Sequence, residues 1–379
     1  MIPFHGRRDR PSPRASFVSS DIYRAAGYGA QHPLGIPRIG TVIDICQAMG
    51  WLDDHAIVDS PRASIDELLN FHDAGYIEAL RDAERSGKVS GQARQRYNLG
   101  GMENPVFAGV FERASMSVGG SIHAAKLSLD GRIAYHPAGG THHGRPDRAS
   151  GFCYFNDPVF AVLAYLEHGL NRVLYVDIDA HHGDGVQDAF APDPRVFTIS
   201  VHEEGRWPHT GLLEDRGAGQ ARNLPVPAGL NDSEFAVLMD EAVMPLAQKF
   251  APQALVVTCG ADALRGDPLS GLALSNGALW RAVMQLAALD LPAVVLGGGG
   301  YNPWTVARCW AGLWARISGQ TIPANVPETV RRLLCALESD LVDEDDIEAR
   351  WLETLTDLPN DGEVRGRIRQ VAKAAVAGN

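Results

Sequence analysis

The sequence predicts a single α/β domain with a central, mainly parallel sheet covered by helices on both faces. Two observations carry this prediction: short β-rich runs alternate with helical patterns, and most of these runs are apolar on both faces. A parallel sheet buried under helices on both sides gives strands without a polar face, and the alternation is typical of a doubly wound α/β domain. The candidate strands are Ile133–His136, Val173–Asp179, Val196–Val201, Ala254–Cys259 and Ala293–Leu296.

Helices are expected before and between these strands. Residues Ile39–Trp51 repeat apolar side chains at helical spacing, and Ser64–Glu67 is a capping-box signature that opens a second helix. Asp157 and Pro158 predict an N-cap followed by proline at the first helical position, which starts a helix over Val159–Glu167.

One large domain is expected from residue 1 to residue 320. A length of 379 residues alone would suit two or three domains, but the candidate functional residues extend from His136 to Tyr301, which favours one. The first 30 or so residues are expected to be an irregular lead-in. Residues 321–379 are expected to form a charged, mostly helical C-terminal extension, separated by Pro323 and Pro327.

Composition narrows the class of protein. A formal net charge of −12 argues against a general nucleic-acid binder and would suit a cationic ligand, although many cytosolic enzymes are as acidic. The five cysteines form no C-x-x-C pair, which fits a reducing compartment. The N-terminus (Arg7, Arg8, Pro11, Pro13) has no apolar segment of the signal-peptide kind, and no apolar run reaches membrane-spanning length. We therefore expect a cytoplasmic protein without membrane or nucleic-acid partners, and a homo-oligomer remains open.

Polar residues follow the ends of the candidate strands. In open α/β sheets, ligands bind outside the carboxyl ends of the strands, so these residues are expected to form one site. They are His136, His142, His143, Asp177, Asp179, His181, Ser200, His202, Asp262 and Tyr301.

Asp179, His181 and Asp262 form a candidate metal site. Side chains alternate along a strand, so Asp177, Asp179 and His181 should project to one side and need a cation or a hydrogen-bond network when buried. Three protein ligands leave a position open for water or substrate, as in catalytic zinc sites. An N/O set of two carboxylates and one imidazole suits Zn²⁺ or Fe²⁺. The alternative is a hydrogen-bonded Asp/His cluster without metal, and the remaining residues favour the metal.

His142 and His143 are candidate bases in a glycine-bracketed loop. Asp177 and Asp184 are spare carboxylates beside the metal ligands, and an Asp–His pair orients the ring and tunes its basicity. Tyr301 follows four glycines, which allow close backbone approach and would place its hydroxyl at the mouth of the site. Taken alone, this tyrosine would more often be a core or rim residue.

These parts together describe hydrolysis of a carbonyl compound. A metal polarises the carbonyl and acidifies water, a histidine takes the proton, and the metal with Tyr301 stabilises the tetrahedral oxyanion.

Several motifs resemble a known family. His136–His143 and Ala149–Asp157 strongly resemble the metal-dependent histone deacetylases and the related acetoin-utilisation proteins. Further matches are 173–185, Gly260–Asp262 with Gly266–Pro268, and Gly297–Asn302; weaker ones at His32–Ile39 and Phe71–Tyr76 extend the similarity to roughly residues 15–320. The class I branch is the most similar. The resemblance implies the arginase–deacetylase fold and removal of acetyl groups from lysine-like amines.

The resemblance also implies a role for each matching position. It makes Asp179, His181 and Asp262 the zinc ligands. It makes His143 the general base, partnered by Asp184, and His142 its electrostatic neighbour, partnered by Asp177. Tyr301 becomes the oxyanion donor.

Substrate and potassium residues are implied in the same way. Phe152 and Trp207 match the two aromatic walls of an acyl-lysine tunnel, with Gly151 beside them, Leu269 at the rim, Glu103 near a rim acid that grips substrate backbone, and Arg38 at the inner end. A structural potassium ion would use the backbone around Asp177, Asp179 and His181 with Ser200 and Val201. Trp207 stands where phenylalanine is common and Glu103 where aspartate is usual, and these two departures bear on the width of the tunnel and the geometry of its rim.

The predicted function is that of a zinc-dependent amidohydrolase acting on N-acetylated amines, most of all acetyl-lysine of proteins or peptides. One alternative is an acetylpolyamine or other small-amine deacetylase, although Leu269 stands where polyamine-preferring relatives carry a gatekeeping glutamate. Others are a catalytically silent acyl-lysine binding protein, which loss of Tyr301 or a metal ligand would favour, and a binuclear arginase-like ureohydrolase, which needs further ligands.

Overall fold

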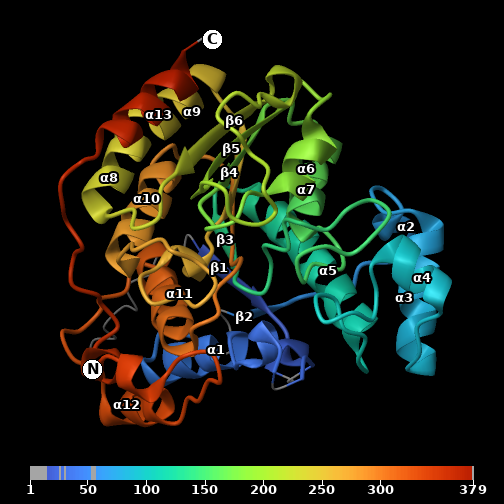
Figure 1. The fold of residues 1–379 in the computed structure, drawn as a ribbon, viewed down its shortest axis with the longest axis horizontal. Helices are drawn as coiled ribbons and strands as arrows, with labels where there is room; N and C mark the ends of the chain where they lie inside the picture. Colours follow the sequence, from blue (N-terminus) through green and yellow to red (C-terminus); the bar gives the residue numbers. More distant parts are fainter. Residues whose placement is uncertain (1–14, 25–26, 30, 53–56, 378–379) are drawn as a thin grey trace, which may run out of the picture.

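The sheet forms the centre of the molecule. The structure is a computed structural model that describes residues 15–24, 27–29, 31–52 and 57–377. Eight parallel strands form one sheet in the order β2-β1-β3-β8-β7-β4-β5-β6 (Figure 1). Their bounds are β1 Ala15–Ser19, β2 Ile57–Asp59, β3 Ile133–His136, β4 Val173–Asp177, β5 Val196–Glu203, β6 Ala221–Val226, β7 Ala254–Thr258 and β8 Ala293–Leu296. The predicted α/β class with a central parallel sheet is confirmed.

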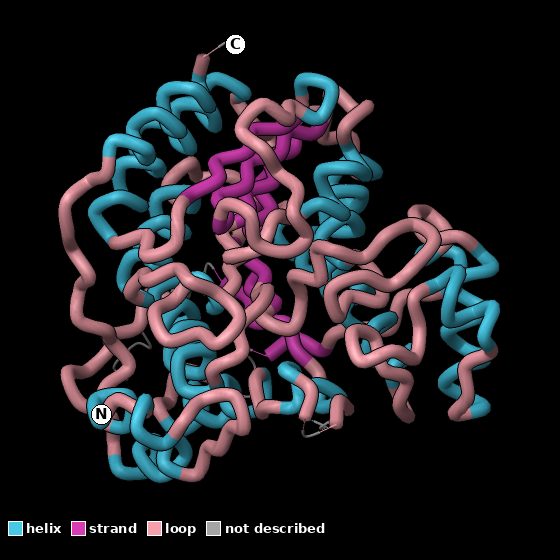
Figure 2. Tube along the Cα trace, in the orientation of Figure 1, coloured by secondary structure: helices cyan, strands magenta, loops and turns pink. Residues whose placement is uncertain are grey.

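Helices cover both faces of this sheet (Figure 2). The α-helices are α1 Ile39–Ala48, α2 Ile65–Leu68, α3 Ala74–Ser86, α4 Gly91–Tyr97, α5 Val110–Ser128, α6 Asp157–Glu167, α7 Asp184–Phe190, α8 Asp232–Leu238, α9 Met244–Phe250, α10 Asn276–Ala287, α11 Pro303–Ile317, α12 Glu328–Cys335 and α13 Gly366–Val376. A π-helical turn, Met239–Val243, joins α8 to α9. No helix within the described residues is both long and apolar enough to cross a membrane.

Two hydrophobic cores follow from the alternation of side chains along the strands. In β4, Leu174 and Val176 belong to the core cluster that also contains residues of α1 and of α8 to α13, while Val173 and Tyr175 belong to the cluster with residues of α3, α5, α6 and α7. Buried apolar residues on both faces explain why these strands read as continuous hydrophobic runs.

All five predicted strands are present, with shifted ends. The predicted strand Val173–Asp179 stops at Asp177, because the backbone N–H of Asp179 turns to the side chain of Asp177, 3.2 Å from its Oδ1 atom. The strand predicted to end at Cys259 stops at Thr258, and the one predicted to end at Val201 continues to Glu203 along its partner β6.

The expectation of an irregular lead-in is wrong for Ala15–Ser19. These residues form β1, which pairs with both β2 and β3. The part of that expectation on residues 1–14, with Arg7, Arg8, Pro11 and Pro13, lies outside the described residues. Two further strands, β2 and β6, were not expected: β2 has three residues, and β6 contains Arg222, Asn223 and Pro225.

Two predicted helix starts can be compared with the structure. The capping box at Ser64 is confirmed, since its hydroxyl accepts the N–H of Glu67 and the Glu67 carboxylate accepts the N–H of Ser64. The N-cap predicted at Asp157 is wrong: Asn156 caps α6 by accepting the N–H of Val159. Asp157 becomes the first helical residue, and its carboxylate instead accepts the N–H groups of Gly140 and Thr141.

The C-terminal segment packs onto the same core as the rest of the chain. Val330, Trp351, Leu355 and Ile368 are buried in the cluster that contains the strands of one sheet face. The helical part is smaller than expected, because α12 and α13 are separated by a stretch that contains only short 3₁₀ turns.

The strand order gathers the carboxyl ends of β8, β7 and β4 side by side. Tyr301 follows β8, Asp262 follows β7, and Asp179 follows β4. The register aligns Thr258 with both Asp177 and Leu296, so three loops start at one level. The fold thereby creates a crevice at the edge where ligands bind in such sheets.

Candidate active site

Asp179, His181 and Asp262 lie together at the end of the sheet. One ligand atom from each lies within 4.8 Å of the others, and all three residues are buried. The Nδ1 atom of His181 is 2.8 Å from Oδ2 of Asp262 and 3.2 Å from Oδ1 of Asp179. Burial alone would lower the pKa of His181, but its contacts with both carboxylates outweigh burial and raise it to about 10. Two carboxylates enclosed in this way need a cation or hydrogen-bond donors beside them, and the set of two carboxylates and one imidazole fits a divalent ion such as Zn²⁺.

Glycines allow the carboxylates to approach the backbone. The N–H of Gly299 donates to Oδ2 of Asp179 over 2.6 Å, and the N–H of Ala180 donates to Oδ1 of Asp262 over 3.1 Å. A Cβ atom on Gly299 would lie 2.0 Å from Oδ2 of Asp262, and one on Gly260 would lie 2.1 Å from Oδ2 of Asp179. The glycine run before Tyr301 therefore also encloses the acidic cluster, a role that the sequence did not suggest.

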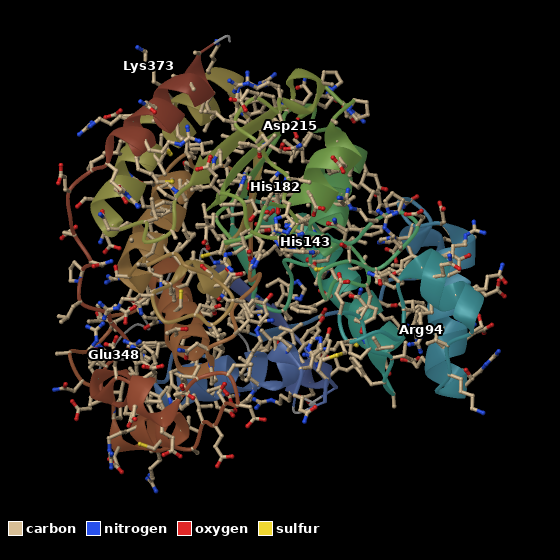
Figure 3. The ribbon with its side chains drawn as sticks, in the orientation of Figure 1. Arg94, His143, His182, Asp215, Glu348 and Lys373 are labelled. Atoms are coloured by element: carbon tan, nitrogen blue, oxygen red, sulfur yellow. The ribbon has the colours of Figure 1, made fainter. Side chains whose placement is uncertain are left out.

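Each histidine of the adjacent pair meets a different carboxylate. The Nδ1 atom of His142 lies 2.7 Å from Oδ2 of Asp177, and that of His143 lies 2.7 Å from Oδ1 of Asp184. In both rings the other nitrogen, Nε2, is turned away from the partner carboxylate. Figure 3 labels His143 near the centre of the molecule, away from Arg94, Glu348 and Lys373 at its periphery.

The surroundings shift the pKa values of the two rings in opposite directions. Burial would lower the pKa of His142, but the charges of Asp177 and Asp179 raise it to about 9. Burial and the positive charge of His142 lower the pKa of His143 to about 3, against the effect of Asp184. At neutral pH, His142 is a cation and His143 a neutral imidazole able to accept a proton.

Further polar groups hold these carboxylates. Tyr175 donates its hydroxyl to Oδ2 of Asp177 over 2.6 Å. The guanidinium of Arg145 contacts Oδ2 of Asp184 and also pairs with Asp188. Burial would raise the pKa of Asp184, but the hydrogen bond with His143 and the charges of His143 and Arg145 lower it to about 2. The carboxylate of Asp184 is therefore ionised at any ordinary pH.

The phenol of Tyr301 lines the same cavity as the histidine pair. Its ring centroid is 6.5 Å from that of His181 at an angle of 89°, and the residue is 7% exposed. Burial and the nearby charge of Asp262 raise its pKa well above 10. The hydroxyl is therefore protonated and can donate a hydrogen bond.

Two aromatic side chains flank the way into this cluster. The Trp207 ring lies edge-on to that of His143 with centroids 4.6 Å apart, and the Phe152 ring lies 6.0 Å from that of Tyr301. A Cβ atom on Gly151 would lie 2.3 Å from the Trp207 ring and 2.7 Å from the His143 ring, so only glycine fits beside them. Leu269 lines the same outer cavity, which has a volume of about 680 Å³.

Glu103 lies at the rim, and its carboxylate faces the protein. Oε1 accepts the N–H of Gly151 over 2.6 Å, and Oε2 accepts from the side chain of Asn98 over 3.1 Å. The turn that it holds is unusual, because Gly151 and Phe152 both have positive φ, 54° and 66°. A non-glycine residue in that region carries a backbone cost of roughly 1 kcal/mol.

Arg38 lines a second cavity of about 230 Å³, which is also lined by Asp179, His181 and Tyr301. Its Nη2 atom donates to the carbonyl of Gly298, and its guanidinium lies 4.8 Å from the Trp310 ring centroid. Burial lowers its pKa from the usual value.

Ser200 and Val201, which were expected at a potassium site, lie in the strand next to β4. Asp177 of β4 aligns with Ser200 of β5, and Val201 follows in the same strand. The Ser200 hydroxyl lies 2.9 Å from Nδ1 of His202.

Sequence reasoning missed three residues that hold the site in place. Arg145 and Asn98 lie in loops whose proximity to Asp184 and Glu103 depends on tertiary structure. Asp267 is 6% exposed, and its carboxylate accepts the backbone N–H of Tyr301. Burial and the charge of Asp262 raise the pKa of Asp267 to about 7. The only signal for Asp267 was its place in the motif Gly266–Pro268.

Known proteins resemble this chain in sequence and in structure. A family profile described as "Histone deacetylase domain" matches residues 32–317. Histone deacetylase 8 of Xenopus tropicalis is 34% identical over 302 residues, covering 77% of this chain and 81% of the relative. Histone deacetylase 1 of Homo sapiens is 38% identical over 311 residues, covering 79% of this chain and 64% of the relative.

Among solved structures, the crystal structure of an HDAC homologue from Aquifex aeolicus superposes with a TM-score of 0.91 at 36% identity. The match covers 96% of this chain and all of the homologue (100%). A crystal structure described as an HDAC homologue complexed with SAHA matches with the same TM-score, 0.91.

Proposed function

The chain belongs to the histone deacetylase family, and on that premise we propose that it is a zinc-dependent amidohydrolase that removes acetyl groups from acetyl-lysine in proteins or peptides. Family membership makes the chain a hydrolase with the arginase–deacetylase fold. Acetyl-lysine as the substrate, zinc as the metal and the role of each residue are the proposal.

One observation carries the mechanism: a neutral, oriented imidazole and a protonated phenol line the same cavity as an acidic cluster that fits a metal, and both rings lie close to that of His181. Asp179, His181 and Asp262 would hold Zn²⁺, which supplies Lewis acidity toward a carbonyl group and toward water. The same three ligands would also accept Fe²⁺.

His143 is the general base. Its Nδ1 atom faces Asp184, so Nε2 is free to take a proton from the attacking water. Asp184 fixes the ring and stabilises the imidazolium that forms. The protonated His143 then returns this proton to the leaving amine.

His142 and Tyr301 stabilise charge. His142 stays protonated beside Asp177 and keeps the pKa of its neighbour low, so that His143 is unprotonated before the reaction. Tyr301 donates its hydroxyl to the oxygen of the scissile carbonyl as negative charge develops there.

Further assignments belong to the same proposal. Phe152 and Trp207 flank the acyl-lysine side chain, with Gly151, Leu269, Glu103 and Arg38 around it. The proposal also includes a structural potassium ion near Asp177, Asp179, His181, Ser200 and Val201. It further includes a catalytic domain at residues 1–320 with a C-terminal extension at residues 321–379, and a cytoplasmic location.

A small acetylated amine is the second candidate substrate. Both oxygens of Glu103 already accept hydrogen bonds from Gly151 and Asn98, which leaves this carboxylate less available to grip a peptide backbone. A short cationic substrate would not need that grip, and the net charge of −12 would attract it.

The test compares both substrate classes on one zinc-loaded preparation. We expect kcat/KM for acetyl-lysine peptides to exceed that for acetylated polyamines. The reverse order would replace the protein substrate by a small amine, and tight binding of acetyl-lysine peptides without turnover would indicate an acyl-lysine binding protein instead.

A further inference from the structure

We infer that Asp267 is a positioning residue that fixes the phenol of Tyr301 relative to the substrate rim at Leu269. The inference rests on the proposed function, because it assigns Tyr301 a role in the reaction.

The carboxylate of Asp267 joins two loops. Oδ2 accepts the backbone N–H of Tyr301 over 2.7 Å, and Oδ1 accepts the backbone N–H of Leu269 over 2.9 Å. Tyr301 follows β8 and Leu269 follows β7, so a single side chain fixes the distance between a catalytic residue and a rim residue.

Asp267 is the anchor at the backbone N–H of Tyr301 itself. The four residues before it, Gly297–Gly300, have no side chains that could hold the loop, and Gly298 and Gly300 have positive φ values of 143° and 137°. Glycine leaves the backbone free in many conformations. Other ties lie on either side of Tyr301: the N–H of Gly299 donates to Asp179, Arg38 donates to the carbonyl of Gly298, and the side chain of Asn302 donates to the carbonyl of Gly266 over 2.9 Å. The tie at the N–H of Tyr301 itself is the one to Asp267.

Leu269, the second residue that Asp267 contacts, is connected through Arg206 to the aromatic side chain of Trp207. Its carbonyl accepts from Nη1 of Arg206 over 3.0 Å, and Arg206 directly precedes Trp207. The guanidinium of Arg206 also pairs with Glu203, which in turn accepts the N–H of Gly271 over 2.7 Å. Hydrogen bonds therefore link Asp267 directly to Tyr301 and Leu269, and through Leu269 to Arg206 next to Trp207.

Asp267 is 6% exposed, and burying a carboxylate costs free energy unless hydrogen-bond donors or cations contact it. Here two backbone N–H groups, those of Tyr301 and Leu269, each donate to one oxygen of the carboxylate. An asparagine has an oxygen at only one of these two positions and an NH₂ donor at the other, which would face an N–H group. The substitution Asp267→Asn therefore keeps the size of the side chain and breaks one of the two hydrogen bonds.

The experiment is a double-mutant cycle in the zinc-loaded protein. It measures kcat and KM on the N-acetylated substrate that turns over fastest, for Asp267→Asn, Tyr301→Phe and the double variant. We expect Asp267→Asn alone to lower kcat about 100-fold, the effect of misplacing a catalytic group by about 1 Å. In the Tyr301→Phe background it should lower kcat by about two-fold or less.

Asp232→Asn is the matched control. Asp232 is also a buried aspartate that accepts two N–H groups, from Ser275 and Asn360, and it lines neither cavity of the site. It should lower the melting temperature as Asp267→Asn does, without lowering kcat. An equal loss of kcat from Asp267→Asn in both Tyr301 backgrounds would overturn the inference, because independent sites contribute additively.

Two measurements keep the inference testable if a variant folds poorly or if no substrate is found. Asp267→Ala removes both acceptors without adding a donor and enters the same cycle. A crystal structure of either variant with Tyr301 in its original place would overturn the inference whatever the substrate. Absence of turnover in the unaltered protein would instead refute the proposed function.

Discussion

The rings of His142 and His143 lie with their centroids 4.0 Å apart, yet their pKa values shift in opposite directions. Two charged rings at this distance would repel each other, so the pair carries a single positive charge, one proton more than two neutral rings. The charges of Asp177 and Asp179 place that proton on His142. His143 is left neutral beside Asp184, as a general base requires.

The proton on His142 makes stability depend on pH in the metal-free protein. A histidine whose pKa is raised on folding contributes stability that is fully present below its unfolded pKa of about 6.5. That contribution is lost as pH rises through the folded value of about 9. The stability advantage of the unaltered protein over His142→Gln should shrink by roughly 3 kcal/mol between pH 6 and pH 10. Urea unfolding of both metal-free proteins measures it, and a gap independent of pH would refute a charged His142.

Gly299→Ala should weaken metal binding. The new Cβ would lie 2.0 Å from Oδ2 of Asp262 and 3.1 Å from Oδ2 of Asp179, so the carboxylates must move. We expect zinc affinity to fall roughly 10- to 100-fold, as when groups that orient metal ligands are altered. Competition with a chelator measures it. Gly277→Ala, whose Cβ meets nothing nearer than 3.6 Å, should bind zinc normally; equal affinities in both variants would argue against this metal site.

Glu103→Ala should affect substrate binding more than chemistry. Without the carboxylate, the N–H of Gly151 loses its acceptor and the turn at Phe152 loses a support for its positive φ. A charged hydrogen bond of about 1.5 kcal/mol corresponds to a KM increase of roughly 10-fold. Glu84→Ala removes a carboxylate that accepts the N–H of Phe111 outside the site and is the control. A fall in kcat with constant KM would assign Glu103 a different role.

Much of the site could be predicted because it follows from local patterns and one topological rule. Asp179 and His181 are two residues apart after a buried strand, and Asp262 follows a second strand, so the rule that parallel strands end at one edge brings the three together. The idea that adjacent histidines require acceptors gave Asp177 and Asp184 as candidate partners, and the family resemblance assigned Asp177 to His142.

Other features could not be predicted, because their signals are weak or depend on tertiary structure. The strand β6 carries Arg222, Asn223 and Pro225, which contradict a buried strand; it forms at the edge of the sheet, where proline is tolerated. The inward turn of Glu103 depends on where Asn98 and Gly151 meet in space. No local pattern contains that information.

The most direct test of the proposed mechanism is the turnover of zinc-loaded Tyr301→Phe. This substitution removes only a hydroxyl, so zinc content and fold should match the unaltered protein. Loss of one oxyanion donor should lower kcat about 100- to 1000-fold on acetyl-lysine peptides. Turnover equal to that of the unaltered protein, at equal zinc content, would contradict the assignment of Tyr301 and with it the mechanism.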